Sequence, residues 1–249
     1  MEDDMKTQAD NATKADGGSG HGAMKLFIKA LVWTVVSFLI LALLLFLPAG
    51  TILWPAGWIF LILLLGFTVV NTGLLFTSDP GLLQERLSLS QPNLKTSDKV
   101  LTAVNSLLGL AWLILMPFDA VRFHWSQMPL FLQIVGAIVL IGFMPLAILT
   151  FRENSFLSGM VCVQEERGQT VISTGPYHYI RHPLYSSALL FFLGTPLLLG
   201  SWYGLLCVPI VIAGLVGRTL LEERVLRKEL PGYDAYMAQV KYRLIPYVW

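Results

Sequence analysis

Charged residues are scarce in this chain. Only 13% of its 249 residues are Asp, Glu, Lys or Arg, while 55% are hydrophobic, and an average soluble domain carries roughly 25% charged residues. The 17 basic and 16 acidic residues leave a net charge of +1, so the protein has no overall field that would attract nucleic acid. This balance indicates a chain surrounded by lipid.

Cysteine is nearly absent as well. Cys162 and Cys207 lie far apart and in no CxxC or Cys/His spacing, so the sequence predicts neither a disulfide framework nor a metal site. Both are interpreted as small apolar packing residues. The chain also lacks the GxGxxG turn of nicotinamide-binding folds, which argues against a membrane reductase.

The first 24 residues differ from the rest of the chain. They are polar, without aromatic residues, and contain Gly17-Gly18-Ser19-Gly20, so we expect a disordered tail. Lys25 and Lys29 then precede an apolar run at 30–47. This order resembles a signal peptide, but the run is longer than the usual apolar core and no convincing cleavage site follows, so we expect a retained first span.

Six apolar runs are long enough to cross about 30 Å of hydrocarbon. They lie at 30–47, 54–76, 100–117, 130–150, 184–200 and 202–221. Pro196 and Pro209 interrupt the last two, so a tight kinked hairpin is an alternative to two clean crossings. The sequence therefore predicts an all-α polytopic membrane protein, with four membrane helices in 25–150 and a catalytic region in 151–249 that includes the last two.

The basic residues predict the orientation, because Lys and Arg collect on the cytoplasmic side of a membrane. With six spans and both termini inside, 16 of the 17 basic residues face the cytoplasm and Arg122 alone lies outside. Two cytoplasmic stretches, 151–183 and 218–246, then flank the last hairpin. We expect them to meet and to form a pocket on the cytoplasmic face.

Local signals within these stretches suit a small polar ligand. Gly175-Pro176 indicates a turn, and Pro183 is suited to the first helical position with His182 just before it. Free N–H groups at a helix start suit the carboxylate of an amino-acid-like cofactor. Taken singly, His182 could be only a helix cap, and Tyr177, Tyr179 and Tyr185 could be interfacial aromatics.

Arg218 and Glu222 lie four residues apart, which places them on one face of the last helix, while Glu223 points elsewhere. They could form an interfacial ion pair, although arginine before glutamate is the less favourable order. An arginine that reaches toward lipid is costly unless it is paired or functional. The residues alone leave both interpretations open.

Together these residues resemble the isoprenylcysteine carboxyl methyltransferase family, integral-membrane enzymes related to phospholipid N-methyltransferases. The similar segments run from Gln164 to Ile172, then GPYHYIRHPLY at 175–185, RTLLEER at 218–224, LPGYDAY at 230–236 and RLIP at 243–246. The resemblance extends from roughly residue 160 to the C-terminus. Gln169 stands where the eukaryotic prenylcysteine enzymes have histidine, and the spacing after Gln164 also differs.

The resemblance implies that S-adenosylmethionine is the cofactor. The residues that it assigns to the cofactor pocket are Gln164, Gln169, Thr170, Val171, Ile172, Tyr177, His182, Pro183, Leu184, Tyr185 and Glu222. It implies that Arg218 faces a lipid-borne acceptor, and we expect Arg218 and Arg181 to be the catalytic residues. The predicted partners are therefore membrane lipids and a lipophilic or prenylated substrate.

The kind of group that is methylated can be argued from whether it must lose a proton first. A carboxylate is ionised at pH 7 and needs only a cation to hold it, a role that suits Arg218. An amine or thiol must first lose a proton, and only Glu222, Glu223 or His182 could act as the base. This favours O-methylation of an isoprenylcysteine-like carboxylate. Phospholipid or amine N-methylation and thiol S-methylation stay open, whereas a transporter is disfavoured because the span centres lack ionisable groups.

Overall fold

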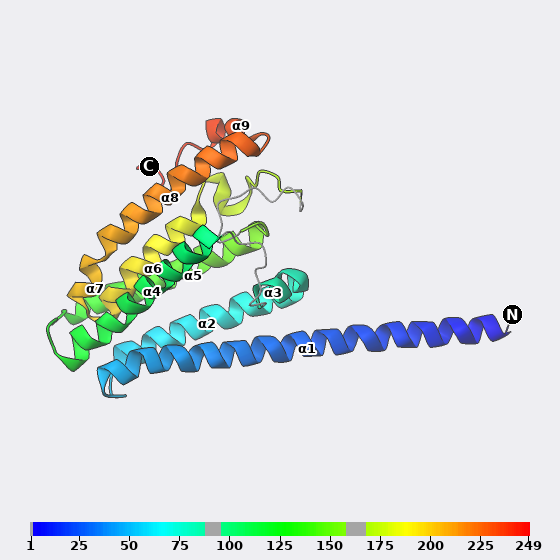
Figure 1. The fold of residues 1–249 in the computed structure, drawn as a ribbon, viewed down its shortest axis with the longest axis horizontal. Helices are drawn as coiled ribbons and strands as arrows, with labels where there is room; N and C mark the ends of the chain where they lie inside the picture. Colours follow the sequence, from blue (N-terminus) through cyan, green and yellow to red (C-terminus); the bar gives the residue numbers. More distant parts are fainter. Residues whose placement is uncertain (1, 88–95, 158–167) are drawn as a thin grey trace.

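The computed structural model describes residues 2–87, 96–157 and 168–249, which form helices and no strand. The first half contains α1 (Glu2–Ala49), α2 (Pro55–Ser78), the short α3 (Pro80–Arg86), α4 (Thr96–Pro117) with the π-helical turn η1 (Phe118–Arg122), and α5 (Leu130–Glu153). The second half contains the 3-10 turn η3 (Gly175–His178), α6 (Pro183–Leu199), α7 (Trp202–Leu206), α8 (Val208–Glu229) and α9 (Tyr233–Gln239). The long helices run side by side, with α3 and α9 toward one end and α7 at the other (Figure 1).

Five helices are long and apolar enough to cross a membrane: Gly22–Ala49, Pro55–Ser78, Ala103–Arg122, Leu130–Glu153 and Trp202–Glu229. The sixth predicted span corresponds to α6, whose 17 residues extend about 26 Å at 1.5 Å per residue. Just beyond α6, the Ser201 hydroxyl donates to Asp119 Oδ2 at 2.6 Å, so α6 reaches the end of the bundle where η1 lies. The prediction of an all-α polytopic membrane protein is confirmed.

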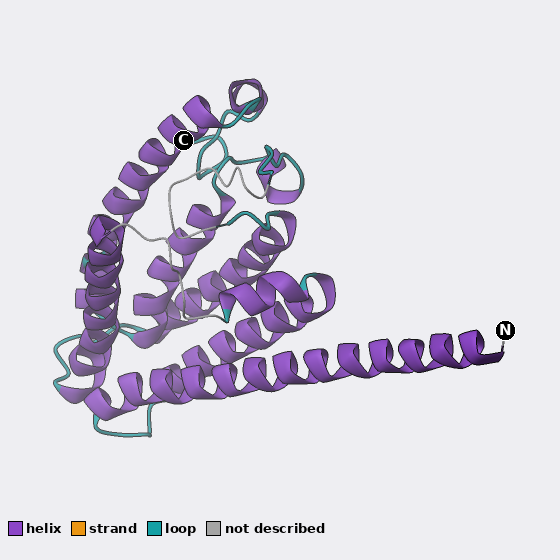
Figure 2. Cartoon of the chain, turned by 45° about the vertical axis from the view of Figure 1, so that its right-hand side comes forward, coloured by secondary structure: helices purple, strands orange, loops and turns teal. Residues whose placement is uncertain are grey.

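The N-terminal segment differs from the expected disordered tail, because α1 extends back to Glu2. Helix formation is costly to nucleate but cheap to propagate. The apolar span supplies the nucleus, and the polar turns before it continue the same helix (Figure 2).

Helices α5 and α6 pack closely against each other. A methyl group built at Gly136 would lie 2.3 Å from the backbone nitrogen of Leu198, and one built at Gly194 would lie 2.8 Å from Leu140 Cγ. Only glycine allows two helix backbones to approach this closely. α5 therefore fixes the position of α6, the helix that begins at the cavity described below.

A buried carboxylate anchors the opposite end of the bundle. Asp119 is fully buried, and its Oδ2 accepts hydrogen bonds from the hydroxyls of Ser126 and Ser201, each at 2.6 Å. Gly200 ends α6 with φ 82°, and α7 is a separate short helix before α8. The hairpin therefore has a kinked connection between α6 and α8, and this is the alternative that the two prolines had left open.

Candidate active site

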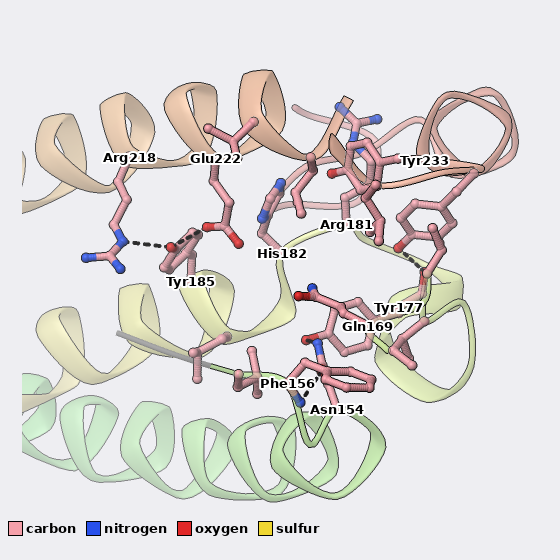
Figure 3. A pocket seen from close by; sticks show the side chains of 18 of the residues that line it. Asn154, Phe156, Gln169, Tyr177, Arg181, His182, Tyr185, Arg218, Glu222 and Tyr233 are labelled. Carbon is pink, nitrogen blue, oxygen red and sulfur yellow. Dashed lines mark hydrogen bonds between the residues drawn. The ribbon is translucent and has the colours of Figure 1, made fainter. Parts of the chain in front are cut away.

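A cavity of about 570 Å³ opens at the end of the bundle where α5 and α8 terminate and α6 begins. Its volume is within the range of small-molecule sites, roughly 300–1,000 Å³. The side chains that line it come from α3, α5, α6, α8, α9, η3 and the segments on either side of η3, and most of them are drawn in Figure 3. The two stretches that flank the hairpin, 151–183 and 218–246, meet here as expected.

Most of the predicted site residues line this cavity. They are Gln169, Thr170, Val171, Ile172, Tyr177, Arg181, His182, Leu184, Tyr185, Arg218 and Glu222. Pro183 is buried and opens α6 without lining the cavity. Gln164 lies outside the described residues, so its predicted role stays a prediction.

The start of α6 has the predicted local structure. His182 is the N-cap, with φ −127° and ψ 64°, and Pro183 occupies the first helical position. The backbone nitrogen of His182 donates to the carbonyl of Arg243 at 2.9 Å, and the imidazole stacks on the Tyr185 ring at 5.7 Å between centroids. The C-terminal segment therefore holds the entrance of α6 in place.

Glu223 is the centre of a buried ionic cluster beside the cavity. Its side chain is 5% exposed and accepts hydrogen bonds from Arg181 Nε at 2.7 Å and Arg243 Nε at 2.8 Å, while His182 Nε2 lies 3.4 Å from Oε1. Arg181 also donates to the Val240 carbonyl at 2.8 Å. A buried charge requires such partners, so Glu223 ties α8 to the entrance of α6 and to the C-terminal segment.

Arg218 and Glu222 share a face of α8, as their spacing predicts, and they converge on one hydroxyl. The Tyr185 hydroxyl accepts a hydrogen bond from Arg218 Nε at 2.8 Å and donates to Glu222 Oε2 at 2.5 Å (Figure 3). The same hydroxyl thus connects a cation and a carboxylate of the cavity wall. Because the two groups are joined through Tyr185, the arrangement favours a site over a simple ion pair.

A tyrosine wall closes the outer side of the cavity. The Tyr177 hydroxyl accepts from Asn154 Nδ2 at 2.9 Å, and the Tyr236 hydroxyl donates to the Tyr177 carbonyl at 2.7 Å. Burial raises the pKa of Tyr177, Tyr233 and Tyr236 above the usual value, so all three stay neutral at physiological pH. Tyr179, by contrast, is 68% exposed and stays a candidate interfacial aromatic.

Tyr233 adds a feature that points to a ligand. Its hydroxyl is buried and has no hydrogen-bond partner among the described residues, and the side chain lines the cavity. Buried polar groups in native proteins are nearly always satisfied. A polar ligand in the cavity would supply the missing partner.

Several residues that line or adjoin the cavity were not among the predicted site residues. Tyr233 and Tyr236 belong to the LPGYDAY segment, whose similarity to the family was the signal that could have identified them. Glu223 was predicted to point away from Arg218 and was named only as a possible base, and its partners are distant in sequence. Arg86 of α3 also lines the cavity, and no sequence pattern marked it.

Residues 131–231 match the family model described as phospholipid methyltransferase. The matched segment begins with α5 and ends just after α8, so it contains the three long helices that line the cavity, but neither α3 nor α9. This part of the chain is similar to integral-membrane methyltransferases, in agreement with the resemblance drawn from the motifs. No match was found among curated proteins.

Proposed function

Because residues 131–231 match the phospholipid methyltransferase model, we propose that the protein is a membrane methyltransferase that transfers a methyl group from S-adenosylmethionine to a carboxylate of a lipophilic acceptor. The observation that carries the proposal is the Arg218–Tyr185–Glu222 arrangement in one cavity. The Glu222 carboxylate can bind the amino group of the cofactor. One helical turn away, the Arg218 guanidinium can bind an anionic acceptor.

The lining residues fit the cofactor in chemical type. Glu222 suits its ammonium group, the aromatic rings of Tyr177 and His182 suit its adenine ring, and the unsatisfied Tyr233 hydroxyl requires a polar partner. The other residues that we propose for binding are Gln164, Gln169, Thr170, Val171, Ile172, Pro183, Leu184 and Tyr185. When bound, S-adenosylmethionine supplies a methyl group already activated by its sulfonium, so the protein contributes mainly by positioning.

A carboxylate acceptor is favoured because the two possible carboxylate bases are already engaged, which leaves His182 as the remaining candidate base. Glu223 is fully engaged by two arginines, and Glu222 already accepts the Tyr185 hydroxyl. A carboxylate acceptor needs no base, and a guanidinium such as Arg218 can hold it with two parallel hydrogen bonds. An isoprenylcysteine-like carboxylate is an acceptor of this kind.

Arg181, which the sequence predicts to be catalytic, has contacts that suit a different role. Its side chain is 4% exposed and donates to Glu223 and to the carbonyls of Val240 and Lys241. We therefore assign Arg181 to positioning. It fixes the position of His182 and the start of α6 relative to α8. Arg218 is then the residue proposed to contact the acceptor.

Phospholipid N-methylation is the second candidate, because the matching family is described as phospholipid methyltransferase. It requires a base, and His182 is the lining residue best suited to accept a proton. The two candidates are separated by offering labelled S-adenosylmethionine and the purified protein a panel of prenylated cysteines, phospholipids and small thiols. Labelling of a prenylated cysteine, reversed by base hydrolysis of the methyl ester, is the expected result; labelling of an amine lipid alone would replace the first candidate by the second.

The bound acceptor must reach the cavity from the bilayer while the cofactor arrives from water. We propose that the cavity faces the cytoplasm, as the distribution of basic residues predicts. Cysteines introduced at Ser78 and Gln169, in a background with Cys162 and Cys207 replaced by serine, should react with an impermeant reagent from one side. A cysteine at Gln127 should react from the opposite side, and labelling of all three from the same side would contradict this topology.

A further inference from the structure

One described residue that precedes α5 in the chain reaches the cavity. Arg86, the last residue of α3, is the only described lining residue that precedes α5. An apolar cluster holds α3 against its neighbours, since Leu82 and Leu83 pack with Ala30 of α1 and Leu75 of α2. The first two helices therefore fix the position of Arg86, and this residue lies outside the segment 131–231 that matches the family.

The Arg86 guanidinium lies over the ring of Phe151, with 4.6 Å between its central carbon and the ring centroid. A cation–π contact of this kind restricts the movement of the guanidinium. The N–H groups lie in the plane of the group, in the fork that binds carboxylate or phosphate with two parallel hydrogen bonds. The aromatic ring thus prepares Arg86 to bind an oxyanion.

Helix direction places this pair at the membrane side of the cavity. α5 and α8 both run toward the cavity end, so earlier residues lie deeper in the bundle. Phe151 is about 4.5 Å deeper than Asn154, and Arg218 is about 6 Å deeper than Glu222, at 1.5 Å per residue. α5 and α8 lie on opposite sides of the cavity (Figure 3), and Phe151 and Arg218 each lie toward the membrane part of their own helix.

Apolar side chains also line the cavity. Leu157, Ala188 and Leu215 line the cavity together with Phe151. A ligand that reaches Arg86 therefore carries an apolar part beside its charge. This combination is that of an anionic amphiphile from the membrane.

We propose that Arg86 determines acceptor specificity by binding the oxyanion of a membrane-borne amphiphile. The oxyanion is a carboxylate or a phosphate, and the atom that is methylated need not belong to it. The inference rests on the proposed function for its description of the ligand as an acceptor. Binding of the anion itself requires neither cofactor nor turnover.

The test measures binding to the full-length protein in a neutral maltoside detergent, by titration with dodecyl phosphate and with N-dodecanoylglycine. Arg86→Gln should weaken binding of one or both anions about tenfold, the loss expected for a charge-assisted hydrogen bond. Arg152→Gln is the matched control, because Arg152 follows Phe151 directly, has a 62% exposed side chain and does not line the cavity. It should leave both affinities unchanged.

The pattern of loss identifies the source of the anion. Loss for dodecyl phosphate alone indicates a phosphate headgroup, and loss for N-dodecanoylglycine alone indicates a carboxylate. Unchanged affinity for both anions, or weakened binding of S-adenosylmethionine instead, would overturn the proposal. Phe151→Leu keeps the arginine and removes its platform, so it should weaken anion binding less than Arg86→Gln does, and it serves if Arg86→Gln does not fold.

The same titrations separate this inference from the proposed function. If the protein does not bind S-adenosylmethionine but its anion affinity depends on Arg86, the proposed function fails and the inference stands. If it binds the cofactor and methylates an acceptor with an unchanged KM in Arg86→Gln, the inference fails and the proposed function stands.

Discussion

The two halves of the molecule use their polar residues differently. In α1, α2 and α4, the described membrane segments expose apolar side chains such as Leu39, Ile62 and Leu107. In α6, α8 and the C-terminal segment, buried charges are joined to one another, with Glu223 holding Arg181 and Arg243. An apolar helix needs only lipid and a few close contacts, whereas a catalytic cavity needs side chains fixed by specific partners. The described residues that line the cavity belong to α5 and the segments after it, apart from Arg86, so the proposed function depends mainly on that part of the chain.

Removal of the Glu223 carboxylate should have the largest effect, a loss of stability of the protein. Glu223→Ala leaves Arg181 buried without its acid, which costs about 3–5 kcal/mol of unfolding free energy. Asp234→Ala is the control, since its ion pair with Arg227 has side chains 58% and 69% exposed and contributes about 0–1 kcal/mol. Thermal unfolding in detergent measures both, and equal losses would mean that the buried cluster does not stabilise the catalytic half.

Arg218 should affect turnover next most strongly. Arg218→Ala should lower methyl transfer about tenfold or more through loss of a charge-assisted contact. Arg218→Lys should be impaired as well, because lysine cannot supply the planar two-point contact. Cofactor affinity should survive in both variants. Full turnover in the lysine variant, with cofactor binding lost in the alanine variant, would make Arg218 only a structural partner of the Tyr185–Glu222 pair.

Tyr185→Phe should have an intermediate effect. It removes the hydroxyl that bridges Arg218 and Glu222 and keeps the ring that stacks on His182. We expect S-adenosylmethionine affinity to fall a few-fold, in line with about 0.5–1.5 kcal/mol for one hydrogen bond, with an unchanged unfolding temperature. Unchanged affinity and turnover in the folded variant would mean that the Tyr185 hydroxyl has no role in cofactor binding or catalysis.

The smallest effect is expected in the first half. Lys25→Gln and Lys29→Gln together change an exposed face of α1 far in sequence from the cavity. Such surface changes are usually within ±0.5 kcal/mol, so methyl transfer and cofactor affinity should stay within about twofold. A loss of methyl transfer as large as that of Arg218→Ala would show that α1 also takes part in the reaction.

The sequence predicts elements whose signal is local. Apolar runs of sufficient length are confirmed as helices, and Pro183 after His182 opens α6 as predicted. The four-residue spacing correctly places Arg218 and Glu222 on one face, because the period of a helix is fixed. Side chains whose positions depend only on helix spacing or on helix-start residues can be located from the sequence alone.

Features that depend on distant partners could not be predicted. Glu223 is adjacent to Glu222 in sequence, and nothing local reveals that Arg243 would reach it. Asp119 lies beyond the predicted third span, yet it is fully buried, because Ser126 and Ser201 converge on it from other segments. Arg86 is a basic residue in a connecting segment, and only the packing of α3 brings it to the cavity.

Calorimetric titration of S-adenosylmethionine into the detergent-solubilised protein tests the central claim most directly, with Glu222→Gln and Arg218→Lys as the paired variants. The cofactor should bind to the wild-type protein, bind about tenfold more weakly to Glu222→Gln through loss of a charge-assisted hydrogen bond, and bind to Arg218→Lys with nearly unchanged affinity. No binding to the wild-type protein, or equal binding to wild type and folded Glu222→Gln, would contradict the claim that this cavity is a cofactor site with Glu222 at its cofactor end.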